Sequence, residues 1–281
     1  MKSLQLRTAL QTISGQMTSD GAGVKINRLI GGNLIAEQDP FLLFDEFLSD
    51  DPNDYIGGFP DHPHRGFETV TYMLAGKMRH QDNRGNSGLL EAGSVQWMTA
   101  GKGLVHSEMP EQENGLMWGF QLWINLPAKS KMIPPRYQDI PPQNIPEVET
   151  LDGALIRVIA GTFSNVEGPI HGIDAEPLYL DVRLGNATSL EIPIPSTHSA
   201  FAYCYEGEVC ISGNLVEKGK LVSLSEGDYI TVQGCSVSSQ DSLILVAGKP
   251  FSEPIVRYGP FVMNTKEEIQ QAIHDAQNGL I

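Results

Sequence analysis

The sequence is poor in cysteine and in positive charge, and it contains no long apolar run. Three cysteines in 281 residues are an odd number in a long chain, which does not fit a disulfide framework and favours a reducing compartment. No apolar run approaches the roughly 20 residues that span a bilayer. The opening residues, MKSLQLR, lack the apolar segment of a secretory signal. We therefore expect free thiols and a cytoplasmic protein.

Lysine and arginine total 19 against 34 aspartates and glutamates, which gives a formal net charge of −15. Binding to a nucleic-acid backbone requires clustered basic side chains, and the sequence has no basic run. We therefore expect no direct contact with nucleic acid, so any role in transcription would act through a protein partner. Apolar residues make up 41% of the chain, which is enough for one large domain or two of ordinary size.

Short β-prone segments, rich in branched and aromatic residues, recur about every ten residues between glycine turns. The clearest of them are residues 67–75, 117–126, 155–159, 178–184, 200–205 and 243–246. This spacing is typical of an antiparallel sandwich or barrel. One helix is predicted near the end of the sequence, where Thr265 and Glu268 form a capping box and Gly279 supplies a stop signal.

Six prolines lie between Pro127 and Pro146. Because proline fixes φ and has no amide donor, this region is predicted to be an extended connection without regular strands or helices. We place the domain boundary here. Residues 1–134 then form an N-terminal domain, and residues 135–281 form a C-terminal domain that carries no His-x-His motif and ends in the helix.

Four potential metal ligands occur as two pairs with i, i+2 spacing, His62 with His64 and His106 with Glu108. On an extended strand, residues two apart point to the same face. Each pair can therefore aim two ligand atoms at one point, and two paired strands would complete the site. Three imidazoles and one carboxylate suit a divalent transition metal and leave coordination positions open.

The residue pattern alone leaves the carboxylate ligand undecided. Counting by twos from His64 along a regular strand places Glu68 on the same face. A bulge at Gly66 would break that alternation. Glu68 and Glu108 therefore remain alternatives at this point.

Three further side chains are weaker candidates. Asp45 and Glu46 follow an apolar run, and carboxylates in that position are more often solvated strand ends than ligands. His80 lies near a turn, and a lone histidine is more often an outer or exposed residue than a ligand. We expect none of these three to bind the metal.

At these positions the chain resembles the pirin family of the cupin superfamily. The resemblance extends over most of the sequence and is weakest over residues 150–250. Its motifs are HPHRGFETVTY at 62–72, GNSG at 85–88, VQWMTAG at 95–101, HSEMP at 106–110 and VRYGPFVMNT at 256–265.

The resemblance implies an all-β fold of two cupin-type antiparallel β-barrel (jelly-roll) domains with a short C-terminal helix. It also implies one divalent transition metal in the N-terminal domain, held by His62, His64, His106 and Glu108. That choice favours Glu108 over Glu68. Iron(II) is the first expectation for the metal, with manganese, nickel and zinc as alternatives.

Two functions are compatible with the resemblance. The first is a dioxygenase of the quercetin 2,3-dioxygenase type, in which O₂ opens the ring of a flavonol or a similar small aromatic substrate. In that reaction Glu108 would act as the base that takes the flavonol proton. The second is an iron-binding, redox-sensitive regulatory protein that acts through a transcription factor or a metabolic enzyme. Fold alone does not decide between them, and the sequence carries no substrate-specific motif.

Overall fold

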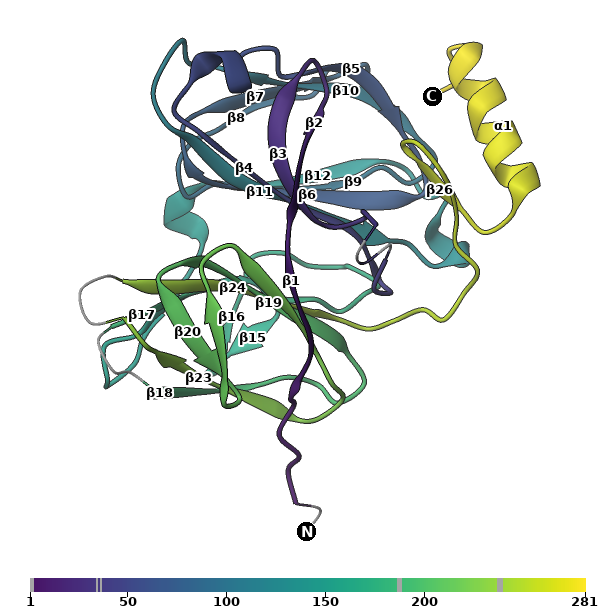
Figure 1. The fold of residues 1–281 in the computed structure, drawn as a ribbon. Helices are drawn as coiled ribbons and strands as arrows, with labels where there is room; N and C mark the ends of the chain where they lie inside the picture. Colours follow the sequence, from purple (N-terminus) through teal and green to yellow (C-terminus); the bar gives the residue numbers. More distant parts are fainter. Residues whose placement is uncertain (1–2, 34, 36, 186–188, 237–239) are drawn as a thin grey trace. The chain divides into compact units, whose positions relative to one another are not determined.

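The computed structural model describes residues 3–33, 35, 37–185, 189–236 and 240–281, and most of them lie in β-strands (Figure 1). Contacts divide the chain into two compact units. Residues 16–142 and 251–281 form one, here called the histidine unit, and residues 1–15 and 143–250 form the second unit. Each unit is discontinuous in sequence, unlike the contiguous domains expected on either side of residue 134. No helix in the described part of the chain has the length and apolarity to cross a membrane.

The histidine unit contains a seven-stranded and a four-stranded antiparallel sheet, which Figure 1 draws as separate layers. The larger sheet has the strand order β12-β9-β6-β11-β4-β3-β2 and the smaller has the order β5-β10-β7-β8. The strands of the larger sheet are β2 (Gln16–Asp20), β3 (Val24–Ile30), β4 (Phe41–Ser49), β6 (Phe67–Ala75), β9 (Val95–Thr99), β11 (Met117–Asn125) and β12 (Arg136–Ile140). Those of the smaller sheet are β5 (Phe59–His64), β7 (Met78–Asp82), β8 (Ser87–Leu90) and β10 (Leu104–Pro110).

Strands β6 and β11 lie where the sequence predicts them, at the centre of the larger sheet. Their branched and aromatic residues favour a pleated, half-buried surface. Tyr72 of β6 pairs with Phe120 of β11, and Phe120 stacks on Phe44 of β4 with ring centroids 5.7 Å apart. All three side chains are fully buried. These large aromatic groups therefore form part of the core of this unit.

One prediction for the proline-rich region is wrong. Residues 127–146 contain the regular strand β12 and two 3₁₀ turns, η2 (Ala128–Ser130) and η3 (Pro142–Asn144). The prolines flank β12 and do not interrupt it, since the segment from Arg136 to Ile140 contains none. It pairs with β9 only, at the edge of the sheet. A third 3₁₀ turn, η1 (Pro52–Asp54), follows β4.

The second unit repeats the pattern with a seven-stranded sheet in the order β1-β22-β19-β24-β17-β14-β13, a four-stranded sheet in the order β18-β23-β20-β21, and the hairpin β15-β16. Its strands are β1 (Ala9–Ser14), β13 (Glu147–Glu149), β14 (Leu155–Ala160), β15 (Thr162–Phe163), β16 (Val166–Glu167), β17 (Leu178–Leu184), β18 (Ser189–Pro193), β19 (Ser199–Glu206), β20 (Glu208–Ile211), β21 (Asn214–Glu217), β22 (Lys220–Leu224), β23 (Tyr229–Gly234) and β24 (Asp241–Gly248). The chain is all-β with one C-terminal helix, as predicted.

The N-terminal arm belongs to the second unit because of one buried arginine. The Arg7 side chain is fully buried and donates to the carbonyl oxygens of Gly227, Ser225 and Pro195 at 2.9, 3.1 and 2.7 Å. Charge-assisted hydrogen bonds of this kind compensate the cost of burying a guanidinium. Beyond Arg7, strand β1 pairs with β22.

The C-terminal segment returns to the histidine unit through the hairpin of β25 (Val256–Tyr258) and β26 (Phe261–Met263) and then forms α1 (Lys266–Gln277). The predicted capping box is present: Thr265 accepts from the Glu268 amide, and the Glu268 carboxylate accepts from the Thr265 amide. The buried Arg65 side chain donates to Asp275 of α1 at 2.7 Å. The helix is thereby attached next to His64.

A buried lysine fixes the turn that follows His64. Lys131 Nζ donates to the carbonyl oxygens of Gly66 and Val262 and to the side-chain oxygen of Asn125 at 2.8, 2.9 and 2.8 Å. The side chain is 1% exposed, and burial lowers its pKa from 10.5 to about 8. One ammonium group therefore joins three separate segments of the histidine unit.

We expect Lys131→Met to lower the free energy of unfolding by about 2–4 kcal/mol at pH 7, since three buried acceptors lose their donor. The lowered pKa also sets a pH dependence. Between pH 8 and 10.5 the unfolded lysine binds a proton that the folded one does not, so the wild type gains stability with rising pH at this site. Urea denaturation at pH 7.5 and pH 9.5 measures both effects. If the difference in the free energy of unfolding between wild type and variant became smaller as the pH rises, the role given to Lys131 would be contradicted.

Candidate metal centre

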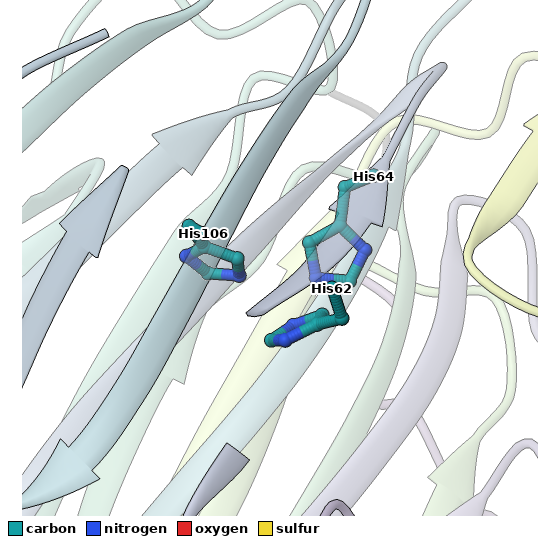
Figure 2. A group of neighbouring side chains, drawn as sticks. All are labelled: His62, His64 and His106. Atoms are coloured by element: carbon teal, nitrogen blue, oxygen red, sulfur yellow. The ribbon is translucent and has the colours of Figure 1, made fainter. Parts of the chain in front are cut away.

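Two paired strands bring the histidines together. In the antiparallel register of β5 with β10, His62 lies directly opposite His106, and His64 lies opposite Leu104. The i, i+2 spacing of His62 and His64 places both rings on one face of β5. Figure 2 shows the three rings converging from these two strands. Two paired strands thus bring the three histidine rings together, and their function as metal ligands stays a prediction.

The three imidazoles lie close enough to share one ion. One ring nitrogen from each lies within 4.8 Å of the others, and the ring centroids are 4.5 to 4.9 Å apart. His64 and His106 are buried, at 3% and 1% exposure. The His64 ring also packs against Trp123 and Phe67, with centroids 5.4 and 5.1 Å away. These contacts restrict its rotation.

The lowered pKa values of the two buried histidines favour the binding of a cation. Burial, reinforced by the neighbouring imidazoles, lowers the pKa of His64 well below 6.5, and burial lowers that of His106 to about 4. Both rings are therefore neutral at pH 7 and carry a free lone pair. The buried Nδ1 of His64 and both ring nitrogens of His106 have no hydrogen-bond partner among the described residues.

His62 completes the donor set. Its Nδ1 lies 2.8 Å from the Pro60 carbonyl oxygen. Because a carbonyl can only accept, Nδ1 is the donor in this contact, which leaves Nε2 as the nitrogen that can bind a metal; metal-binding histidines are commonly oriented in this way. Orphaned buried nitrogens are costly unless an ion or water satisfies them. The residues therefore fit one transition-metal ion.

Glu108 lies in the same cavity but is held by protein donors. Its two carboxylate oxygens accept from the Thr71 hydroxyl and from the Gln121 side-chain amide, each at 3.0 Å. The side chain is 3% exposed. The register between β5 and β10 shifts here, with His106 opposite His62 and Glu108 opposite Phe59, so the extra residue lies on β5. Strand β10 stays in regular register with β7, so Glu108 lies on the same face of β10 as His106. The group within 4.8 Å contains the three histidines without it.

Glu68 occupies a different sheet from His64. Strand β5 ends at His64, and β6 begins at Phe67 in the seven-stranded sheet. Gly66 makes this change of direction with φ of +86°, where a Cβ would lie 2.0 Å from the Val262 carbonyl oxygen. The buried Glu68 accepts from the Thr99 hydroxyl at 2.6 Å. Counting by twos from His64 fails because the strand does not continue.

The three weaker candidates have protein partners. Asp45 is bound by Arg28 through two bonds of 3.0 and 2.7 Å, and Glu46 accepts from Trp118 at 2.9 Å. His80, which the sequence suggested as an outer or exposed histidine, is buried. Its Nε2 lies 3.2 Å from an Asp139 oxygen. None of the three belongs to the histidine group.

Two of the three histidines, His62 and His64, open onto a cavity of ≈ 380 Å³. Its lining includes His62, His64 and Glu108, together with side chains for which the sequence analysis gave no role: Arg28, Phe59, Gln121, Trp123 and Arg257. Gln121 and Trp123 are two residues apart on β11 and so lie on the same face of that strand. Arg257 comes from β25, about 150 positions after His106. Their convergence depends on long-range strand pairing that spacing in the sequence does not reveal.

Comparison with known proteins defines the class first. A model described as Pirin matches residues 23–124, and one described as Pirin C-terminal cupin domain matches residues 179–281. The fold is thus that of a protein with two cupin domains. A quercetin 2,3-dioxygenase from Acinetobacter baumannii has a crystal structure that aligns with a TM-score of 0.89 and 33% identity over 98% of each chain.

A pirin-like protein from Caulobacter vibrioides is 47% identical over 278 residues, covering 98% of this chain and 99% of its own. The chain belongs to the pirin family. A bacterial pirin from Escherichia coli, solved in complex with nickel(II), shares the fold with a TM-score of 0.65 and 19% identity over 84% of this chain and 95% of its own.

We expect His106→Ala to lose the ion, because two imidazoles remain where three converge. Metal binding to the folded state raises thermal stability by mass action. Added Ni(II) or Fe(II) should therefore raise the melting temperature of the wild type by several degrees and leave His106→Ala unchanged. His80→Ala, outside the group, should respond like the wild type. The measurements are thermal melting with elemental analysis of bound metal. Equal metal content in His106→Ala and wild type would contradict this site.

Proposed function

We propose that this protein is a metal-dependent dioxygenase that opens the ring of a flavonol with O₂, as a quercetin 2,3-dioxygenase does. The observation that supports this best is the group of three imidazoles, two of which, His62 and His64, line a cavity of ≈ 380 Å³. That volume is within the usual range for small-molecule sites. The likeness to the Acinetobacter baumannii quercetin 2,3-dioxygenase supports the same reaction class.

The cavity suits a flat aromatic substrate. Phe59, Pro60, Trp123 and Pro260 supply apolar lining beside the histidines. Aromatic faces of this kind pack against planar rings, and the few polar groups present can fix the orientation of the substrate. We propose a flavonol or a related small aromatic compound, together with O₂, as the ligands of this cavity.

We propose His62, His64 and His106 as metal ligands and Glu108 as a fourth. Iron(II) is the first candidate ion, with manganese, nickel and zinc as alternatives. The bound metal would supply a positive charge that stabilises an ionised substrate oxygen and would serve the redox chemistry with O₂. Imidazole binds a metal as a neutral ligand and adds no charge, so Glu108 would leave a net charge of about plus one on a divalent site.

Glu108 is also the proposed base. Its carboxylate lies in the cavity beside the histidines and would take the proton of the flavonol hydroxyl. The hydroxyl of Thr71 and the amide of Gln121 hold its two oxygens. To bind the metal or the proton, Glu108 would exchange one of these hydrogen bonds. The two donors would then orient the remaining oxygen.

We expect metal-dependent oxygen uptake when quercetin is added to protein reconstituted separately with Fe(II), Mn(II) and Ni(II). Quercetin absorbance should fall in parallel, and His106→Ala should serve as the blank. The measurement uses an oxygen electrode with simultaneous spectroscopy. Absence of uptake for quercetin and related flavonols at full metal occupancy would refute the proposed activity.

Glu108→Gln should retain part of the metal, since the three histidines remain, but should lose turnover by about 10²–10⁴-fold, the usual contribution of a general base. Thr71→Val should keep the base and remove one bond that orients it. We expect a smaller loss of turnover for Thr71→Val than for Glu108→Gln. Metal content and steady-state oxygen uptake are measured on the same samples. Full turnover in Glu108→Gln would exclude the base function.

The alternative function, an iron-binding regulatory protein, predicts partner affinity that differs between Fe(II) and Fe(III) protein. No contact among the described residues specifically favours it. The enzymatic function is supported by a cavity whose residues have defined roles, and it is therefore the one proposed.

A further inference from the structure

Arg257 lines the mouth of the histidine cavity, and the function proposed above gives it no role. Its guanidinium lies 4.8 Å from the centre of the Trp123 ring. Two weak hydrogen bonds hold it, from Nη1 to the Leu42 carbonyl at 3.3 Å and from Nε to the Gly259 carbonyl at 3.4 Å. A guanidinium has five N–H donors. The other donors of Arg257 have no protein acceptor among the described residues.

The second arginine of the cavity differs in this respect. Arg28 donates to both oxygens of Asp45 at 3.0 and 2.7 Å and to Asp20 at 3.0 Å. Its charge is therefore matched within the protein. No carboxylate of the described chain forms an ion pair with Arg257. Burial and the like charge of Arg28 lower the pKa of Arg257, and the charges of Asp45, Asp20 and Glu37 act in the opposite direction.

The Arg257 guanidinium is suited to bind an anion. Stacking on Trp123 fixes the plane of the guanidinium, and a fixed plane presents its donors to a carboxylate or similar oxyanion with little loss of entropy. Trp123 also packs against His64, with ring centroids 5.4 Å apart. The stacked pair thus joins the metal centre to the cavity mouth.

We propose that Arg257, stacked on Trp123, binds an anionic oxygen group of an aromatic ligand at the mouth of the histidine cavity and thereby selects acidic aromatic compounds over neutral ones. The aromatic part is indicated by the apolar lining from Phe59, Pro60 and Pro260. This assignment adds a substrate class to the proposed function. Its relevance to catalysis rests on that function. Binding itself does not require turnover.

Two carboxylates that line the cavity oppose anion binding, Asp20 and Glu108. Both oxygens of Glu108 are held by Thr71 and Gln121. The Asp20 side chain is 53% exposed and is bound to Arg28. Exposed charges are strongly screened by water and salt, and the Arg28 guanidinium lies between this carboxylate and Asp45. Arg257 is the lining cation that forms no ion pair with a carboxylate of the described residues, and we therefore assign the local preference for anions to it.

The test is calorimetric titration of metal-free protein at pH 7.5 with 2-naphthoate and with 2-naphthamide, a neutral compound of nearly the same shape. We expect the wild type to bind the carboxylate about tenfold more tightly, equivalent to about 1.4 kcal/mol. In Arg257→Gln the preference should fall to about twofold or less, while the affinity for the amide stays the same. Arg257→Lys, which keeps the charge without the planar fork, should retain part of the preference.

Arg79→Gln is the matched control, because Arg79 pairs with Glu111 at the surface and does not line the cavity. It should bind both compounds like the wild type. An unchanged preference in Arg257→Gln would overturn the proposal. An equal loss of affinity for both compounds in that variant, with an unchanged melting temperature, would overturn it too. Arg257 would then support the packing of the cavity and would not recognise charge.

The same measurement separates this proposal from the dioxygenase. A naphthoate preference that depends on Arg257, found in protein that takes up no oxygen with flavonols, would uphold the anion site and refute the enzymatic function. Oxygen uptake with quercetin, found in protein whose preference for naphthoate is absent or independent of Arg257, would uphold the enzyme and refute the anion site.

Discussion

The candidate metal centre depends on the passage of the chain from one sheet to the other directly after His64. Gly66 makes this turn at φ of +86°, its amide donates to the Gly101 carbonyl at 2.8 Å, and its carbonyl accepts from Lys131. No side chain fits there, because a Cβ would collide with the Val262 carbonyl oxygen. This turn ends β5 with His62 opposite His106, so the geometry of the donors follows from the backbone.

The C-terminal segment completes that constraint. The Arg65 amide donates to Pro260 at 3.2 Å, and the Val262 amide donates to the Arg65 carbonyl at 3.0 Å. The Arg65 side chain also reaches Asp275 on α1. Residues some 200 positions apart thus hold the strand end that carries His64. The same segment supplies Arg257 to the cavity, which couples support of the donors to the shape and charge of the mouth.

Burial has opposite consequences for the two kinds of polar group in this unit. It keeps His64 and His106 neutral, which prepares lone pairs for a cation. The carboxylate of Glu108 is stabilised instead by two donated hydrogen bonds, from Thr71 and Gln121. Imidazole ligands add no charge, and the Glu108 carboxylate would offset one of the two positive charges of a divalent ion. The remaining positive charge is the electrostatic basis of the proposed reaction.

The sequence by itself determined the β-class, the C-terminal helix and the common face of His62 and His64, because strand periodicity and capping are local properties. The pairing of β5 with β10 then decided that His106 lies opposite His62. The edge strand β12 was missed, since prolines suggested irregular structure on both sides of it. Spacing could not separate Glu68 from Glu108, because the alternation breaks where the chain changes sheets at Gly66. The roles of Lys131, Trp123 and Arg257 were decided only by the tertiary structure. Their partners lie far away in the sequence, and only long-range pairing of strands brings them together.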